Sequence, residues 1–477
     1  MASGNSYNAN LALFVFAALM WSMSQDVMVK KEEPEATGNS SRSFGFVTEQ
    51  MSPQFYQDLV DRGWRRSGGY TYHPDMARTC CPQYAIRLKI GEFKVSRQQR
   101  SSLNRWNRYV SGEEPKTGKG KVKPFDLGPE LRRCCDVSEG MAHRFSMELV
   151  QAVATDETYD LYKRYQIAVH KDPPSKVSRT GFERFLCDSP LGNVPVHYAS
   201  GADTTGLPVE YGSYHLLYRV DEQLVGISVI DILPSCVSSV YFIWDPDWAW
   251  ASLGKLSALY EIGLALDMAA AGAEGMEWLY MGYWISTCQK MRYKGEYAPS
   301  FLLDPGTQEF HPLTAKLDQF LQVHKGYTPF EEVEGMDDAA VREEWEAKRK
   351  EDVTMAEPRE QRPKRTGKLV ASSSDKDDKP ESESDEDEDE DGALSRYPSP
   401  PPPGFGDPES LSRHQLDDLF VFLDHGGKVG VLPYSAFQSG LTPIGQRMTK
   451  ELVAAVGPDR FASTPMQLRT KALLYFG

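Results

Sequence analysis

Three arginines and a tryptophan crowd one short stretch of the chain, and these side chains could bind an anion. The stretch runs from Asp61 to Gly68 and reads Asp-Arg-Gly-Trp-Arg-Arg-Ser-Gly. A guanidinium group has the fork geometry that binds a carboxylate or a phosphate through two hydrogen bonds. The alternative is a solvated loop in which an arginine stacks on Trp64. The residues alone leave both interpretations open.

Two pairs of adjacent cysteines are the second chemical feature. They are Cys80-Cys81 and Cys134-Cys135. Adjacent cysteines cannot easily bind one ion in ideal geometry, but each pair could serve a metal or cluster shared with the other. The alternative is ordinary buried thiols. The chain has seven cysteines, an odd number, and their spacing does not match a disulfide framework. We therefore expect the protein to work in a reducing compartment.

Common catalytic signatures are missing from the sequence. It has no glycine-rich phosphate loop followed by lysine, no Gly-x-Ser-x-Gly elbow and no His-Glu-x-x-His motif. None of the nine histidines is paired at metal-binding spacing. These observations argue against a histidine-based zinc hydrolase.

Charge is distributed unevenly along the chain. The formal net charge is −15, but residues 331–391 alone hold 24 Asp and Glu against 11 Lys and Arg. Residues 51–150 hold 18 Lys and Arg against 11 Asp and Glu, a local balance of +7. The negative total therefore does not exclude a nucleic-acid partner, because a basic N-terminal module can bind a phosphate backbone.

The elements that must position these groups follow from hydrophobic periodicity. The predicted elements are a helix over 147–170, strands over 214–220, 224–232 and 238–243, a helix over 253–271 and a strand over 276–283. Asp221-Glu222 predicts a hairpin turn between the first two strands. Strands followed by a helix and a further strand indicate an α+β or mixed α/β domain.

The two ends of the chain differ in composition from this body. We expect residues 1–45 to be disordered. Their apolar run, 11–21, is too short to span a bilayer, and no Lys or Arg precedes it as in a signal peptide. Residues 331–410 predict a disordered linker, first acidic and then rich in proline. Residues 411–477 predict a small helical tail.

Longer strings resemble the arginyl-tRNA–protein transferase family, in the order in which the family has them. The arginine-rich stretch and the string Thr79-Cys80-Cys81-Pro82-Gln83-Tyr84 resemble its N-terminal domain. The second half adds Gly181-Phe182-x-Arg184-Phe185-Leu186-Cys187, Asp231-Ile232-Leu233-Pro234-x-Cys236-Val237-Ser238-Ser239-Val240-Tyr241, Met281-Gly282-Tyr283-Trp284-Ile285 and Lys290-Met291-x-Tyr293-Lys294-Gly295-x-Tyr297. The matches cover residues 45–315, and the C-terminal extension suggests a fungal-type member.

The resemblance implies a fold and a reaction. The fold is α+β: a small cysteine-containing N-terminal domain, 46–135, precedes a GNAT-like acyltransferase domain, 140–325. The reaction moves arginine from arginyl-tRNA to the α-amino group of proteins that begin with Asp or Glu, which marks them for ubiquitin-dependent N-degron degradation. The expected partners are arginyl-tRNA and these acceptor proteins. We expect a monomer that needs no membrane and works in the cytoplasm, and also in the nucleus.

The reaction implied by the resemblance requires no cofactor, because an amine attacks an ester that is already activated. The family usually also has a four-cysteine site for an iron–sulfur cluster or zinc, which includes an upstream Cys-x-x-Cys pair. Here no cysteine precedes Cys80, so only Cys80 and Cys81 remain as metal ligands. We expect this metal site to be incomplete.

The resemblance also implies roles for individual residues. A carboxylate must hold the guanidinium of the transferred arginine, and Asp231 and Glu261 are the candidates. His215 and Tyr241, on adjacent predicted strands, are candidates for proton transfer or for holding the ester carbonyl. A strand-end cap is the alternative role of Asp231.

Cations must hold the acidic residue of the acceptor. The candidates are Arg65, Arg66, Lys290 and Lys294. Tyr293 and Tyr297 complete the predicted substrate site, with core aromatics as the alternative. The basic segments 97–108 and 116–123 could follow the tRNA backbone or be solvated loops.

Two other functions remain open. A GNAT-type acetyltransferase would share the fold, but its pyrophosphate-binding turn, Arg/Gln-x-x-Gly-x-Gly/Ala, is not found around 252–255. A non-catalytic adaptor would use the acidic linker and the proline run to bind partners.

Overall fold

A computed structural model describes residues 42–48, 50–79, 81–114, 125–135, 140–355, 397–417, 419–425, 428–440, 443–459, 468–469 and 474–476. The predictions for residues 1–41, Cys80, the basic segment 116–123 and the acidic segment 356–396 lie outside these ranges.

A nine-stranded sheet forms the centre of the protein, in the order β13-β12-β5-β11-β10-β9-β8-β6, with β7 paired to β8. The strands are β5 (Tyr84–Lys89), β6 (Phe145–Gln151), β7 (Val194–Pro195), β8 (Glu210–Val220), β9 (Gln223–Ile232), β10 (Cys236–Trp244), β11 (Trp278–Trp284), β12 (Ser300–Asp304) and β13 (Glu309–Pro312). Neighbours are antiparallel except β10 and β11, which are parallel. Parallel neighbours need a crossover connection, and helix α7 (Leu253–Ala270) supplies it.

The strand and helix predictions after residue 210 are confirmed by β8, β9, β10, α7 and β11. The predicted hairpin turn is confirmed too: Asp221 and Glu222 join β8 to β9 with φ of 49° and 69°. A two-residue turn with two positive φ values matches the right-handed twist of the strands.

The helix predicted over 147–170 is wrong at its start. Residues up to Gln151 form β6, because they pair with β8 at positions such as Leu149 and Leu216. The helix α5 (Asp156–Tyr165) begins only after Thr155, whose hydroxyl caps it by accepting from the Thr158 N–H. A π-helical turn, Gln166–His170, ends it.

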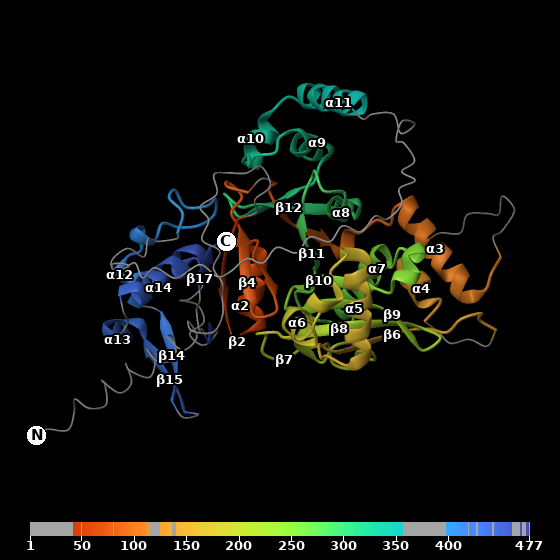
Figure 1. Ribbon diagram of the computed structural model, residues 1–477, viewed down its shortest axis with the longest axis horizontal. Coiled ribbons are helices and arrows are strands. Elements are labelled where there is room, and N and C mark those ends of the chain that lie inside the picture. The colour runs from red at the N-terminus through yellow and green to blue at the C-terminus, as the bar shows by residue number, and fades with distance from the viewer. Residues whose placement is uncertain are drawn as a thin grey trace, which may run out of the picture.

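Helices cover both faces of the sheet, as Figure 1 shows. Those that pack with α7 are α3 (Arg97–Ser111) and α4 (Leu127–Arg132), whereas α5 and α6 (Arg179–Phe182) lie on the other face. Leu216 and Leu217 of β8 belong to the two different hydrophobic clusters. Successive residues of a strand point to opposite faces, so one strand serves both cores.

The N-terminal module holds the arginine-rich stretch in a separate small sheet. Its order is β17-β1-β4-β3, formed by β17 (Leu474–Phe476), β1 (Ser43–Val47), β4 (Tyr70–Pro74) and β3 (Arg65–Ser67), with α2 (Pro53–Asp61) before β3. A two-stranded sheet pairs β2 (Gln50–Met51) with β16 (Leu468–Arg469). The strand β5 also belongs to the predicted N-terminal domain, yet it lies in the large sheet between β12 and β11. The two predicted domains therefore share one sheet.

The region after the sheet is more ordered than predicted. The linker 331–410 begins with α10 (Phe330–Gly335) and α11 (Asp338–Met355), which pack on α9 (Ala315–Val323). The tail is mixed rather than helical, with the hairpin β14 (Phe420–His425) and β15 (Lys428–Pro433) beside α12 (Arg413–Asp417), α13 (Tyr434–Phe437) and α14 (Pro443–Val456). Within the described ranges, no helix combines the length and apolar character needed to cross a membrane.

Candidate functional site

A cavity of about 1160 Å³ opens where β10 and β11 separate. The two strands pair only from Cys236–Trp278 to Ser238–Tyr280. Beyond these pairs each strand has a bulge against its outer neighbour, and Gly282 in the β11 bulge has φ of 68°. Bulges bend strands and interrupt ladders, so the separated strand edges offer backbone groups to a substrate.

Both faces of the sheet contribute to this cavity. Its walls come from β3, the π-helical turn at 166–170, β10, the start of α7, β11 and the residues 289–296 of α8 (Gln289–Arg292) and the turn after it. The ends of parallel strands beside the start of the crossover helix are where ligands bind in open α/β sheets.

Glu261 is a buried carboxylate on the α7 side of the cavity. Its side chain accepts a hydrogen bond of 2.7 Å from the Ser228 hydroxyl, and 1% of the residue is exposed. Burial raises its pKa, although the hydroxyls of Ser228 and Ser239 oppose this shift. No cationic side chain of the described residues pairs with it, so a cation that enters the cavity would find a carboxylate without an ionic partner.

Arg65, which is buried, and Lys294, which is partly buried, are cations on the other side of the cavity. Arg65 Nη1 donates to the carbonyls of Val60 (3.0 Å) and Trp64 (2.6 Å), whereas its Nε has no hydrogen-bond partner. Lys294 Nζ donates to the Tyr283 carbonyl at 2.8 Å. In the described part of the chain neither cation forms a salt bridge, so the two leave a positively charged site beside β11.

Burial, and then the charge of Arg65, lower the pKa of Lys294 to about 8. The repulsion between these two cations would be relieved by an anion bound between them. Both flank Gly282: the Arg65 Nη2 lies 3.5 Å from its carbonyl oxygen, and a Cβ built on it would lie 3.7 Å from the lysine Nζ. The arrangement therefore fits a carboxylate ligand.

Arg66 and Asp231, predicted as two separate substrate-binding groups, bind each other. Arg66 donates from Nε to Oδ2 at 2.8 Å and from Nη2 to Oδ1 at 2.5 Å. Ser213 donates a further hydrogen bond to Asp231. Asp231 is fully buried and does not line the cavity, so it is not free to hold a substrate guanidinium. Glu261 remains the candidate.

His215 and Tyr241 do not come together. His215 is fully buried, and its Nε2 lies 2.8 Å from the Leu186 carbonyl on the α6 side, away from the cavity. Tyr241 lines the cavity, but its histidine neighbour is His170, whose Nε2 lies 3.1 Å from the tyrosine oxygen. His170 also lines the cavity and was missed, because nothing in its sequence neighbourhood marks the end of a π-helical turn.

The other predicted substrate residues lie on the segment after β11. Lys290 is exposed and Tyr293 is partly buried at the cavity wall. Desolvation there and the nearby Glu261 raise the pKa of Tyr293 to about 12. Tyr297 is buried behind them, and its hydroxyl donates to the Lys255 carbonyl at 2.8 Å. Tyr297 therefore supports the wall and does not line it.

Comparison with known proteins decides the family. The family models named "Arginine-tRNA-protein transferase, N terminus" and "C terminus" match residues 32–101 and 157–304. Arginyl-tRNA–protein transferase 1 of Drosophila melanogaster is 29% identical over 61% of this chain and 81% of its own length. The protein of that name from Dictyostelium discoideum is 33% identical over 60% of this chain and 82% of its own length. This chain belongs to the arginine-tRNA-protein transferase family.

Membership makes the protein an aminoacyltransferase, which confirms the family predicted from the sequence strings. The transferase is also similar to a bacterial protein, the aspartate/glutamate leucyltransferase of Pseudomonas syringae. The identity is 30% over 54% of this chain and 83% of that protein. The two groups of relatives differ, by name, in the amino acid that they transfer.

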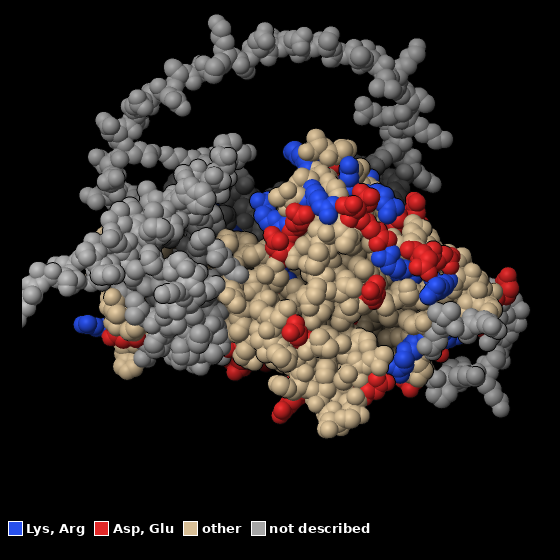
Figure 2. All heavy atoms as spheres, turned by 90° about the horizontal axis from the view of Figure 1, so that it is seen from below, with Lys and Arg blue, Asp and Glu red and all other residues tan. Residues whose placement is uncertain are grey.

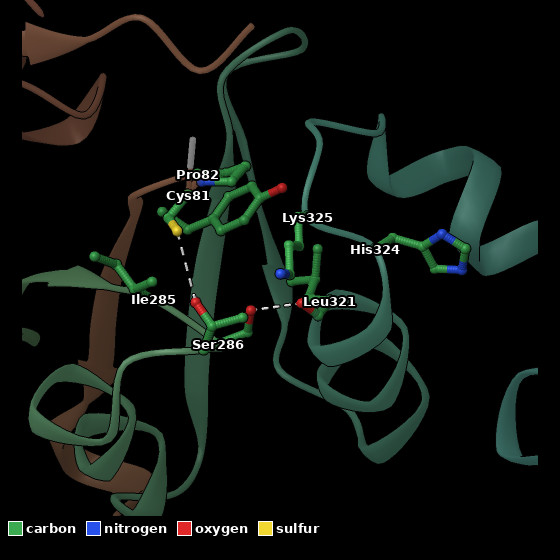
Figure 3. Close-up of a pocket in the computed structure, with 9 residues that line it drawn as sticks. Cys81, Pro82, Ile285, Ser286, Leu321, His324 and Lys325 are labelled. Atoms are coloured by element: carbon green, nitrogen blue, oxygen red, sulfur yellow. Dashed lines mark hydrogen bonds between the residues drawn. The ribbon is translucent and has the colours of Figure 1, made fainter. Parts of the chain in front are cut away.

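Of the two predicted metal ligands of the transferase, Cys81 lies within the described residues and Cys80 outside them. Cys81 lines a small pocket of about 10 Å³, and Figure 3 shows its sulfur directed toward the loop of Ser286. The Thr287 hydroxyl donates to this sulfur at 3.8 Å, and His324 points away from it (Figure 3). Among the described residues, no group of three or more His, Cys, Asp or Glu could hold a metal ion.

The predicted tRNA-binding arginines of the transferase lie on α3. The side chain of Arg105 reaches the start of α7, where its Nη2 lies 3.3 Å from the Ser252 oxygen at the cavity edge. On the face shown in Figure 2, Lys and Arg are interspersed with Asp and Glu, and no broad area carries one sign. Of the two segments predicted to follow the tRNA backbone, the described one, α3, therefore reaches the cavity edge through Arg105.

Proposed function

We propose that the protein transfers arginine from arginyl-tRNA to the α-amino group of proteins that begin with Asp or Glu. One observation carries this proposal: a single cavity holds buried charges of both signs without ionic partners among the described residues. Glu261 supplies the negative charge, and Arg65 with Lys294 supplies the positive charge. The substrates are complementary, because the donor brings a guanidinium and the acceptor brings a carboxylate.

The donor binds on the α7 side. The guanidinium of the arginyl group pairs with Glu261, and hydrogen bonds to a buried carboxylate are stronger than those between neutral groups. The 3′ end of the tRNA enters along α3, whose Arg105 lies at the start of α7. The ion pair with Glu261 and the tRNA contacts along α3 hold the ester carbonyl at the gap between β10 and β11.

The acceptor binds on the side of the N-terminal module. Its Asp or Glu side chain lies between Arg65 and Lys294, which places its α-amino group at the same gap. Two substrates held in one cavity react as if at high effective concentration, and this positioning supplies much of the rate.

The covalent step exchanges one bond for another. The neutral α-amino nitrogen attacks the ester carbonyl carbon, an amide C–N bond forms and the C–O bond to the tRNA ribose breaks. The amine loses a proton, and the ribose oxygen takes one up. Tyr241 and His170, a pair within hydrogen-bond distance on the cavity wall, carry this proton. Unpaired backbone N–H groups of the separated strands stabilise the oxyanion, so no cofactor is needed.

The parallel pair β10 and β11, joined through α7 and separated beyond three residue pairs, supports a GNAT-like assignment for this domain. We extend the proposal to a monomeric enzyme of the cytoplasm, and also of the nucleus, whose products enter the N-degron pathway. An acetyltransferase would not need a buried carboxylate in its acyl-binding site.

A leucyltransferase is the second candidate, because relatives with that name match the chain. The buried Glu261 argues against it, since a leucyl side chain offers this polar group neither a charge nor a hydrogen bond.

Labelled transfer to peptides tests these proposals. Purified protein is incubated with arginyl-tRNA or leucyl-tRNA and with a peptide beginning with Asp or with Ala. We expect label only with arginyl-tRNA and the Asp peptide. Transfer of leucine would overturn the donor assignment, and equal transfer to the Ala peptide would overturn the acceptor assignment.

A further inference from the structure

We propose that the C-terminal segment completes the acceptor site by holding Arg65 in position. The residues concerned are 397–406 and 452–457, which lie beyond the C-terminal family model ending at residue 304. The proposal rests on the proposed function, because it takes Arg65 as the group that binds the acceptor carboxylate. In Figure 1 the N-terminal module, with α2 and β4, lies between the large sheet and the C-terminal helices α12 and α14.

An aromatic stack joins the C-terminal segment to the arginine-rich stretch. The ring of Phe405 lies parallel to that of Trp64, with centroids 5.7 Å apart and an interplanar angle of 4°. Phe405 also meets Phe44 and His73 at centroid distances of 5.6 and 5.0 Å. Only 1% of Trp64 is exposed. Without the segment, this aromatic surface would face water.

Hydrogen bonds also hold Arg62, two residues before Trp64, against the C-terminal segment and Gln308. Arg62 donates from Nη1 to the Val456 carbonyl and from Nε to Gln308 Oε1, each at 2.5 Å. Gln308 Nε2 donates to the Gly404 carbonyl at 2.8 Å. A Cβ on Gly404, which has φ of +83°, would lie 2.2 Å from the Pro305 oxygen. The segment therefore packs closely against the turn between β12 and β13 as well as against the module.

The held stretch leads directly to the cavity. The Trp64 carbonyl, which belongs to the residue stacked on Phe405, accepts a hydrogen bond from Arg65 Nη1. The Gly63 carbonyl accepts from the Tyr283 hydroxyl at 2.7 Å, and Tyr283 lines the cavity. The backbone from Arg62 to Trp64 is therefore fixed by the C-terminal segment on one side and by β11 on the other. Arg65 takes its position from both, and Phe405 is a positioning residue.

A double-mutant cycle tests this role in the full chain. Phe405→Ala should raise the KM for an Asp-starting peptide roughly tenfold, while the KM for arginyl-tRNA stays unchanged. In an Arg65→Met background, Phe405→Ala should have no further effect on the peptide KM. Phe405→Tyr, which keeps the stacked ring, should restore the wild-type value. Gln308→Ala, which removes the hydrogen bonds to Arg62 and Gly404, should act in the same direction as Phe405→Ala.

Other outcomes separate this inference from the proposed function. If Arg65→Met leaves the peptide KM unchanged, the acceptor site itself is wrong. If Arg65→Met raises the peptide KM and Phe405→Ala does not, the positioning role is overturned. The role is also overturned if the effects of the two substitutions on the peptide KM multiply in the double variant. Val341→Ala is the control, because Val341 is a buried side chain of α11 that belongs to a different hydrophobic cluster from Trp64 and Phe405. It should lower the stability of the fold and leave the peptide KM unchanged.

Discussion

Arg66 and Asp231 form a bidentate salt bridge in the interior, with an Nη2–Oδ1 distance of 2.5 Å and an Nε–Oδ2 distance of 2.8 Å. They lie 165 positions apart in the chain, one in β3 and one in β9. The pair therefore attaches the N-terminal module to the large sheet. It also keeps Asp231 from acting as a substrate ligand.

Breaking this pair should destabilise the fold. Asp231→Asn leaves a buried guanidinium without its charge partner, which costs about 3–5 kcal/mol in the free energy of unfolding. Urea denaturation followed by circular dichroism measures the change. Asp267→Asn is the control, because its pair with Arg132 is more than half exposed and contributes little. Equal effects of the two substitutions would contradict the role given to the buried pair.

Replacing Glu261 should weaken donor selection. Glu261→Gln keeps the size of the side chain and removes the charge that binds the arginyl guanidinium. The KM for arginyl-tRNA should rise by roughly 10- to 100-fold, and the preference over leucyl-tRNA should fall. Steady-state kinetics with both charged tRNAs measure this. Glu296→Gln, at a partly exposed carboxylate of the cavity rim paired with Lys255, should change neither value strongly. An unchanged KM in Glu261→Gln would contradict the assignment.

Acceptor binding should weaken as Lys294 loses its proton. Its pKa is about 8 in the folded protein, so the ammonium is charged below this pH and neutral above it. The KM for an Asp-starting peptide should therefore rise as pH increases above 8. Lys294→Arg stays charged over this range and should lack the rise. A wild-type KM that does not change with pH would count against a carboxylate bound at Lys294.

The lowered pKa of Lys294 also affects stability, and here a rise in pH is favourable. The folded value lies below the ordinary value of 10.5, so between pH 8 and 10.5 the unfolded chain binds more protons at this residue. The contribution of Lys294 to the free energy of unfolding should therefore become more favourable as pH rises through this window. Lys294→Met should remove that dependence in denaturation curves measured across the window.

His170, beside Tyr241, and His215, in the core, should respond differently to substitution. His170→Ala removes the neighbour of Tyr241 on the cavity wall and should lower kcat by about tenfold or more with little loss of stability. His215→Ala opens a space in the core beside Leu186 and should lower stability, while the variant that folds keeps its kcat. The reverse pattern would return the catalytic role to His215.

The order of elements from residue 210 to 284 could be predicted, because it depends on local patterns. Short apolar runs predicted the strands, the long apolar stretch 253–271 predicted α7, and Asp221-Glu222 predicted the hairpin. The family could also be predicted, since long irregular strings such as 231–241 identify it without any contact being known.

Side-chain roles within that frame could not be predicted, since they depend on partners far away in the chain. Asp231 and Glu261 look equivalent in sequence, and only the arrival of Arg66 from the N-terminal module pairs one and leaves the other open to the cavity. Residues 147–151 form a strand because their backbone pairs with the edge of β8, and this pairing outweighs the helical spacing of their apolar side chains.

The sequence by itself determined the reaction class, the strand and helix order around the cavity and some of the charged and aromatic residues that line it, such as Arg65, Glu261 and Lys294. The tertiary structure alone decided which charges are free, which histidine faces Tyr241 and how the C-terminal segment supports Arg65. The physical reason is that hydrophobic periodicity is a local property of the chain. The pairing of a buried charge, by contrast, depends on which distant side chain folding brings within hydrogen-bond distance.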